Sequence, residues 1–149
     1  RARSPQGVTV AVRSSKLRVL VFQHEAQVRQ RLAQMLEEAG FEVVTPLDDF
    51  ETAARVAEGP VDLLITDLAM HPIASRRMIN SIQYENPQLK LMVVTPETDS
   101  AILRAADMLG AQAVISKNAP AEVMLRRVHD ILSERCVIAL PMKSGLAAV

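Results

Sequence analysis

Three polar residues stand at the ends of apolar runs, and together they could handle a phosphoryl group. They are Asp67 after residues 61–66, Thr95 after residues 91–94 and Lys117 after residues 114–116. Reactive groups in an open α/β sheet gather just past the carboxyl ends of the strands. A carboxylate there could receive a phosphoryl group, while a hydroxyl and an ammonium could sense it and neutralise its oxygens. The trio therefore predicts a phosphoryl-accepting site on Asp67.

The apolar run at residues 18–22 ends in Gln23, His24 and Glu25, which do not suit a magnesium-dependent form of this site. Mg²⁺ takes oxygen ligands that are usually charged, whereas an amide oxygen is a weaker ligand and imidazole suits transition metals. We therefore expect a weak or absent Mg²⁺ site at Asp67 with Gln23 and His24. A solvated or carboxylate-paired side chain is the favoured interpretation of His24, and Glu25 is interpreted as an acid at a helix start.

Short apolar runs alternate five times with amphipathic segments. The expected strands are residues 17–22, 41–45, 61–66, 89–94 and 113–116, and the expected helices are residues 26–39, 49–58, 75–85, 99–109 and a last one from residue 120 onward. Gly40 and Gly110 fit left-handed helix ends, and Asp48, Ser75 and Asp99 fit helix starts. Strands that alternate with helices of this length predict an α/β fold with a parallel sheet covered on both faces.

The composition argues against several classes of function. The 149 residues include 17 Lys and Arg and 17 Asp and Glu, so the formal net charge gives no general attraction to nucleic acid or to a membrane surface. The single Cys136 excludes an internal disulfide framework and fits a reducing, cytoplasmic compartment. No apolar run reaches the ~20 residues that span a bilayer. Glycine-rich phosphate loops, zinc-type cysteine spacing and nucleophile elbows are absent, so an enzyme is not predicted.

We expect three parts along the chain. Residues 1–16 are a linker or the end of a preceding domain, because they begin with basic residues, lack an initiator Met and include an alternating run at residues 8–12. These features favour a piece of a longer protein over a targeting segment. Residues 17–135 form one domain. Residues 136–149 are a C-terminal extension, and its apolar start at residues 136–141 could pack on the domain or on a partner.

Taken in order, these motifs resemble the receiver domain of bacterial two-component response regulators over roughly residues 17–134. The matching segments are Glu25 with Val28-Arg29, residues 36–44, residues 62–70, Val94-Thr95, Gly110-Ala111 and Ser116-Lys117. The resemblance implies a doubly wound, five-stranded parallel sheet in the flavodoxin-like order 2-1-3-4-5. It also implies that Asp67 is the phosphoacceptor, that Thr95 is the switch hydroxyl, and that Lys117 pairs with the acceptor and with phosphoryl oxygens.

The chain departs from the receiver pattern at several positions. Gln23 and His24 stand in place of the two adjacent acids that hold Mg²⁺ in receivers. The Pro-Gly-x-x-Gly loop of the family reads His-Pro-Ile-Ala-Ser at residues 71–75. Asn118 replaces the proline after the lysine, and Val114 replaces the aromatic switch residue. These departures predict a degenerate metal site and a weakened relay from the switch hydroxyl to the outer face.

The first functional hypothesis is a pseudo-receiver, a signalling module with a degenerate site. It would bind a protein partner such as a histidine kinase, an output domain or a regulator, and neither nucleic acid nor a membrane. Its partner face, which could also form a dimer, would combine the helix after Asp99, the strand that ends in Ser116 and the start of the last helix. The alternative is a working phosphoacceptor in a two-component phosphorelay, phosphorylated on Asp67. A small flavodoxin-like ligand-binding domain is the third hypothesis.

The site residues also have purely structural interpretations. Asp67 could be a strand-end acid paired with Lys117, because such an ion pair perturbs charge much as a functional site does. Thr95 could be a turn residue before Pro96. The role of Lys117 as a site residue is favoured, since it completes the trio.

Overall fold

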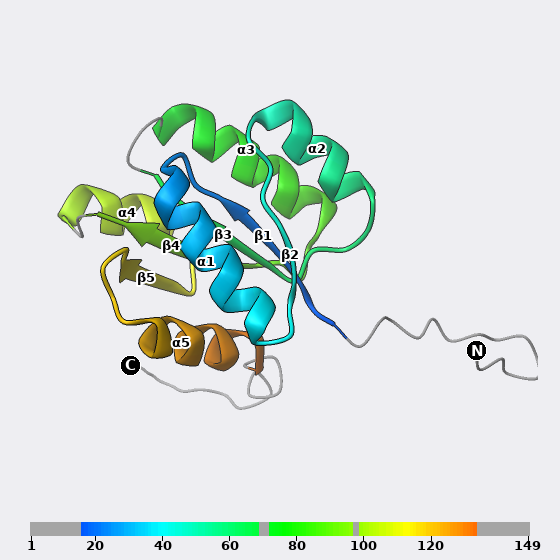
Figure 1. Cartoon of the computed structure of the whole chain (residues 1–149). Coiled ribbons are helices and arrows are strands. Elements are labelled where there is room, and N and C mark those ends of the chain that lie inside the picture. The colour runs from blue at the N-terminus through cyan, green and yellow to red at the C-terminus, as the bar shows by residue number, and fades with distance from the viewer. Residues whose placement is uncertain (1–15, 69–71, 97–98, 134–149) are drawn as a thin grey trace, which may run out of the picture.

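Helices and strands alternate along the chain, as the apolar pattern predicted (Figure 1). The structure is a computed structural model that describes residues 16–68, 72–96 and 99–133. The strands are β1 (Arg18–Phe22), β2 (Glu42–Val44), β3 (Leu63–Thr66), β4 (Lys90–Thr95) and β5 (Ala113–Ser116). The helices are α1 (Ala26–Glu38), α2 (Asp49–Ala57), α3 (Pro72–Glu85), α4 (Ser100–Met108) and α5 (Ala121–Ser133). The predicted linker before residue 16 and the predicted extension from residue 136 lie outside the described residues.

The described strands form one parallel sheet in the order β2-β1-β3-β4-β5, which confirms the predicted doubly wound, flavodoxin-like fold. Because all of these strands run in the same direction, their carboxyl ends lie along one edge of the sheet. The register places Phe22 opposite Thr66 and Thr95 opposite Ser116 at that edge. None of the described helices is long and apolar enough to cross a membrane.

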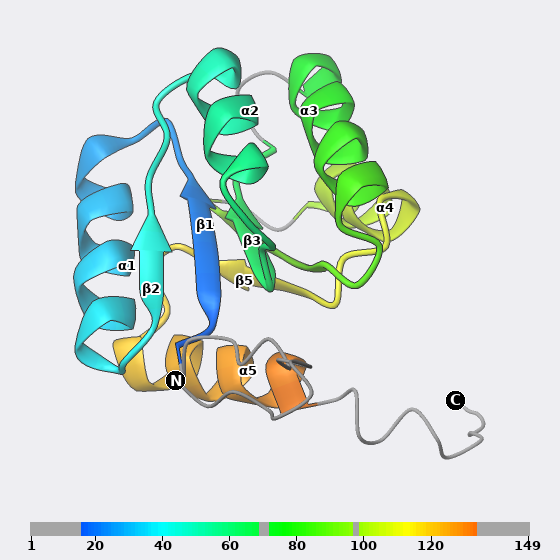
Figure 2. The same cartoon turned by 90° about the vertical axis from the view of Figure 1, so that its right-hand side faces the viewer.

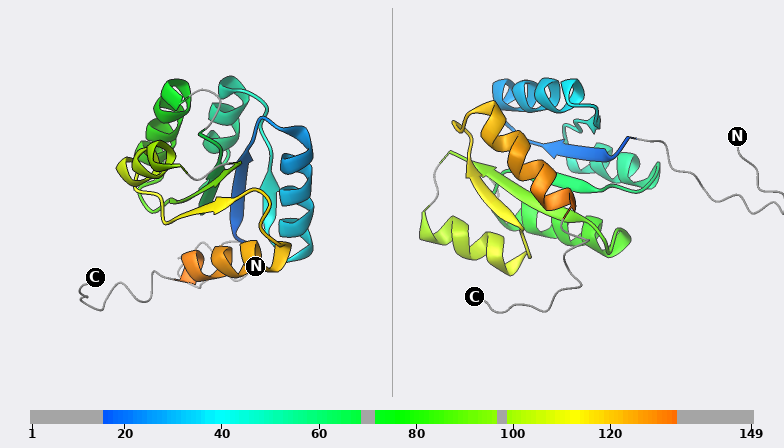
Figure 3. Two further views of the ribbon diagram at one scale, coloured as in Figure 1. Left: turned by 90° about the vertical axis from the view of Figure 1, so that its left-hand side faces the viewer. Right: turned by 90° about the horizontal axis from the view of Figure 1, so that it is seen from below.

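Helices cover the sheet on both faces, with α1 and α5 on one side and α2, α3 and α4 on the other (Figures 2 and 3). Alternate strand residues point to opposite faces, so Val19 and Val21 pack with α1 and α5 while Leu20 packs with the other three helices. Leu36 of α1 and Met124 of α5 are fully buried. Each such side chain contributes roughly 1.5–3 kcal/mol by leaving water. Burial on both faces explains why the strands read as continuous apolar runs.

Polar caps and glycines mark several helix ends where the sequence predicted them. Asp48 and Asp99 each accept a hydrogen bond from the backbone N–H three residues later, at 2.7 and 2.9 Å, at the starts of α2 and α4. Gly40 and Gly110 follow α1 and α4 with φ angles of 99° and 79°. This left-handed conformation closes a helix and favours glycine, which has no Cβ to clash.

The start of α3 differs from the prediction. The predicted cap at Ser75 is wrong, because α3 begins at Pro72. Proline suits the first turn of a helix, since its φ angle is preset and its missing N–H would have no partner within the helix. Residues 72–75, expected to be part of a loop, therefore belong to the helix, and residue 71 lies outside the described residues.

Arg18 joins the amino end of β1 to the C-terminal end of α2. Its buried guanidinium donates to Gly59 O at 2.8 Å and to Arg55 O at 2.7 Å. The carboxylates of Glu58 and Glu42 lie 3.4 and 3.8 Å from the same guanidinium. A helix leaves its last carbonyls without partners, and the planar fork of arginine can satisfy more than one of them. Arg18 therefore holds α2 against the edge of the sheet opposite the predicted site.

Replacing Arg18 with methionine should lower the free energy of unfolding by roughly 2–4 kcal/mol, because two partly buried carbonyls lose a charged donor. Arg18→Lys should recover only part of this loss, since an ammonium lacks the planar fork. Arg104→Met, at an exposed position on α4, is the control and should change stability by less than about 0.5 kcal/mol. Urea denaturation measures all three, and an Arg18→Met protein as stable as the wild type would contradict this role.

Candidate functional site

The predicted site residues come together at the carboxyl edge of the sheet. Gln23 and His24 follow β1, Asp67 follows β3, Thr95 ends β4 and Lys117 follows β5. The backbone N–H of Lys117 donates to Thr95 O at 2.9 Å and ties the ends of two neighbouring strands. The order and register of the strands thus gather the polar groups of the predicted site at the place where open α/β sheets carry their sites.

The carboxylate of Asp67 is in contact with His24. Asp67 Oδ2 and His24 Nδ1 lie 2.7 Å apart, within hydrogen-bonding distance. An ionised carboxylate can only accept, so Nδ1 carries the proton in this contact. The Asp67 side chain is 4% exposed and the His24 side chain is 42% exposed, so the imidazole is the more exposed member of the pair. The structure supports the carboxylate-paired interpretation of His24.

Lys117 pairs with Glu25 rather than with Asp67. Its ammonium lies 2.9 and 3.2 Å from the two carboxylate oxygens of Glu25. The ion-pair partner that the structure gives Lys117 is Glu25, at the N-cap of α1, and not the carboxylate that the structural interpretation of Asp67 expected. The hydrogen bond from Lys117 lowers the pKa of the Glu25 carboxyl, and the positive charge of Lys117 adds to this effect against the opposing effect of desolvation.

The side chain of Gln23 is buried and already engaged. Its Nε2 donates to Val94 O at 3.3 Å, while Arg29 of α1 donates to the backbone oxygen of Gln23 at 2.8 Å. Among the described residues, no group of three or more His, Cys, Asp or Glu side chains is placed to hold a metal ion. Mg²⁺ needs several oxygen ligands in near-octahedral geometry. The donors at this end of β1 do not fit that requirement.

The position of the receiver's aromatic switch holds a smaller, stiffer side chain. Val114 is half-buried and packs against the core on the side of α2, α3 and α4. Thr95, the predicted switch hydroxyl, is almost completely buried at the end of β4. A β-branched side chain is restricted about its single torsion, so it cannot make the large swing that an aromatic ring can make. Movement of the Thr95 hydroxyl would therefore displace little at Val114.

Glu25 and Arg31 contribute to the site in ways that the sequence pattern did not reveal. Glu25 was predicted only as an acid at a helix start, yet its carboxylate holds Lys117. Arg31, on α1, donates to the backbone oxygen of Lys117. Together with Arg29, these contacts tie the start of α1 to the ends of β1 and β5. Glu25 comes just after β1, at the same edge of the sheet as Lys117. That position was the sequence signal that could have identified it as the partner of Lys117.

Comparison with known proteins identifies the family. The response regulator receiver domain matches residues 19–129 of the chain. The chain belongs to this family. It is therefore a receiver domain of two-component regulatory systems, a class of signalling module that interacts with protein partners such as kinases and output domains.

Relatives of the chain include longer proteins. It is 26% identical over 117 residues to a cyclic di-GMP phosphodiesterase of Thermotoga maritima, covering 78% of this chain and 31% of that protein. It is 29% identical over 133 residues to the oxygen regulatory protein NreC of Staphylococcus haemolyticus, covering 87% and 61%. The chain thus spans less than two thirds of both relatives. A response regulator crystal structure from Thermotoga maritima shares the fold, with a TM-score of 0.72 and 24% identity over 79% of this chain and 98% of that one.

Removing the ammonium of Lys117 should raise the pKa of the Glu25 carboxyl toward its ordinary value. Because that pKa is lowered in the folded domain, Glu25 stabilises the fold above the ordinary carboxyl range and loses this contribution as the pH falls through the lowered pKa. A carbon-detected NMR titration of Glu25 in wild type and in Lys117→Met measures the difference. Lys90→Met, at the amino end of β4, is the matched control, and equal shifts in both variants would contradict the assigned ion pair.

Proposed function

We propose that this receiver domain is a pseudo-receiver that binds its protein partner without phosphorylation of Asp67. The contact between His24 Nδ1 and Asp67 Oδ2 at 2.7 Å is the observation that supports this proposal most strongly. In a phosphoaccepting site the carboxylate oxygen must reach phosphorus, and cations must surround the transferred group. Here the imidazole of His24, the more exposed member of the pair, lies against one oxygen of that carboxylate.

The ammonium of Lys117 also has a partner within the chain. The Lys117 ammonium, which would pair with phosphoryl oxygens, is held by Glu25 at 2.9 Å. A phosphoryl group would therefore have to displace His24 from Asp67 and compete with Glu25 for Lys117. Both displacements oppose transfer, so the unmodified arrangement is the favoured one.

The proposal extends to the metal. Gln23 and His24 remove two formal negative charges from the place where receivers hold Mg²⁺, and the Gln23 amide is bonded to Val94 O instead. Of the carboxylates that remain, Asp67 carries the imidazole contact and Glu25 holds Lys117. A divalent cation gains little from such donors, since it needs charged oxygens to offset the loss of its water shell. Mg²⁺ binding should therefore be weak or absent.

The partner face in this proposal is built from α4, β5 and the start of α5. Large apolar side chains are exposed there on both helices, namely Leu103, Met108 and Val123. A phosphorylation signal requires a free-energy difference between two conformations of the domain. The stiff Val114 side chain has no large alternative position that could create such a difference. The face would thus be recognised as it stands by a histidine kinase, an output domain or a regulator in the cytoplasm. It is also the face through which we first expected a dimer.

A working phosphoacceptor in a phosphorelay is the second candidate function. One observation favours it, because Asp67, Thr95 and Lys117 still follow the ends of three neighbouring strands. In this alternative, His24 swings away from Asp67 and Lys117 leaves Glu25 when a phosphoryl donor binds. The two candidates differ in how readily Asp67 reacts in the wild-type chain.

Titration of the wild-type chain with Mg²⁺ should give no saturable binding at Asp67 tighter than about 1 mM, a weak affinity on the general scale. The reason is the loss of the two acids at Gln23 and His24. Amide NMR shifts at the carboxyl edge of the sheet follow the titration, and Asp67→Asn is the control. Tighter binding that Asp67→Asn abolishes would contradict the degenerate site.

Placing acids at positions 23 and 24 should restore Mg²⁺ binding and phosphoryl transfer to Asp67. The double variant Gln23→Asp with His24→Asp should bind Mg²⁺ and accept a phosphoryl group on Asp67 from acetyl phosphate, because it removes the imidazole and supplies two oxygen ligands. Without metal it should be less stable than wild type, since three carboxylates then crowd one site. Adding Asp67→Asn gives the control. A folded double variant that stays unreactive would show that the block lies elsewhere in the site.

A further inference from the structure

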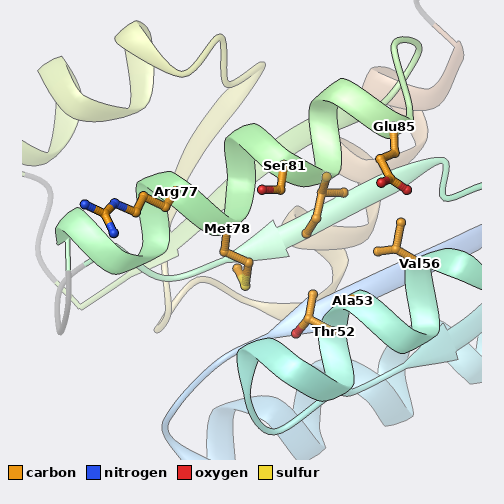
Figure 4. Close-up of a pocket in the computed structure, with 8 residues that line it drawn as sticks. Thr52, Ala53, Val56, Arg77, Met78, Ser81 and Glu85 are labelled. Carbon is orange, nitrogen blue, oxygen red and sulfur yellow. The ribbon is translucent and has the colours of Figure 1, made fainter.

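A shallow groove runs between α2 and α3, on the side of the sheet away from α1 and α5. Its volume is about 260 Å³, and apolar side chains from both helices line it, among them Val56, Met78 and Ile82. Figure 4 shows Ala53 and Val56 on α2 opposite Met78 on α3. The groove is distant from the chemistry of the carboxyl edge, and nothing in the proposed partner face uses it.

The α3 rim of this groove carries a charge pattern that is complementary to itself. Arg77, Ser81 and Glu85 follow one another at intervals of four residues, and they lie along one side of α3 in Figure 4. The Cα atoms of Arg77 and Glu85 are therefore about 12 Å apart along the helix axis, at equal distances from that of Ser81. Within the described part of the chain, neither Arg77 nor Glu85 makes an ion pair or a side-chain hydrogen bond.

We propose that this rim is a contact between two copies of the chain, related by a two-fold axis that passes beside Ser81. In such a contact the two α3 helices run antiparallel, and Arg77 of each copy meets Glu85 of the other. The three residues form a ridge of the i±4 type, and two such ridges pack side by side when helices cross at about −50°. The small side chain of Ser81 at the centre allows close approach. Because the charges on the α3 rim complement one another, a second copy of the chain is the partner that fits this rim.

Tyr84 supports the same arrangement. It is the only tyrosine of a chain whose aromatic content is 3%, and it is 86% exposed on α3. Tyrosine is enriched at protein interfaces because its rigid ring covers a large area at low entropic cost. An antiparallel contact centred on Ser81 brings Tyr84 of each copy to the level of the second copy's α3 turn that precedes Ser81, where the ring can cover surface of the other helix.

Charge reversal tests this proposal without any knowledge of another partner. Sedimentation of the full wild-type chain should show a concentration-dependent dimer. Arg77→Glu and Glu85→Arg should each weaken the dimer at least tenfold, because each change places like charges together at both ends of the contact. The doubly reversed variant should dimerise like wild type, and an equimolar mixture of the two single variants should form dimers, since each then supplies the charge that the other needs.

Three controls keep the outcome specific. Arg104→Glu, an equal reversal on the exposed side of α4, should leave the dimer unchanged, whereas Tyr84→Ala should weaken it. Far-UV circular dichroism checks that the variants fold, as expected for exposed positions. A wild-type chain that stays monomeric at its highest soluble concentration would overturn the proposal. So would a dimer that survives both single reversals but is broken by Met108→Asp, because that result would assign the contact to α4.

Discussion

The structure at the carboxyl edge is constrained by the carboxylate of Asp67, which is almost completely removed from water. An unpaired charge in such a place is costly, so it requires a partner. The imidazole of His24 is placed to meet that need, with Nδ1 2.7 Å from Asp67 Oδ2. Lys117 pairs with Glu25, so both polar groups of the site have partners within the chain.

The core packing and the hydrogen bonds of α1 fix the positions of the site residues. Core side chains on both faces of the sheet set the strand order and register, and so they place Asp67 beside the end of β1. Arg29 and Arg31 of α1 bind the backbone oxygens of Gln23 and Lys117. A tightly packed interior changes between discrete arrangements rather than deforming gradually. We therefore regard the carboxyl edge as a fixed surface, in which a stiff valine stands where receivers place an aromatic ring.

The sequence predicted the fold better than it predicted the site contacts. Strand positions, strand order and the caps at Asp48 and Asp99 follow from local patterns and from the receiver resemblance, and the structure confirms them. The start of α3 was missed because Pro72 suits the first turn of a helix as well as it suits a loop. The partner of Lys117 was missed because the sequence offers two carboxylates at strand ends, Asp67 and Glu25, and spacing along the chain cannot rank contacts between side chains from different elements.

A crystal structure of the wild-type chain soaked with Mg²⁺ and beryllofluoride tests the central claim most directly, because beryllofluoride mimics a phosphoryl group on an aspartate. The account predicts that His24 Nδ1 stays within hydrogen-bonding distance of Asp67 Oδ2, that Lys117 stays on Glu25, and that neither the metal nor the mimic is seen at the site. Beryllofluoride on Asp67, with Mg²⁺ beside it and His24 turned into solvent, would contradict the account and show a working phosphoacceptor.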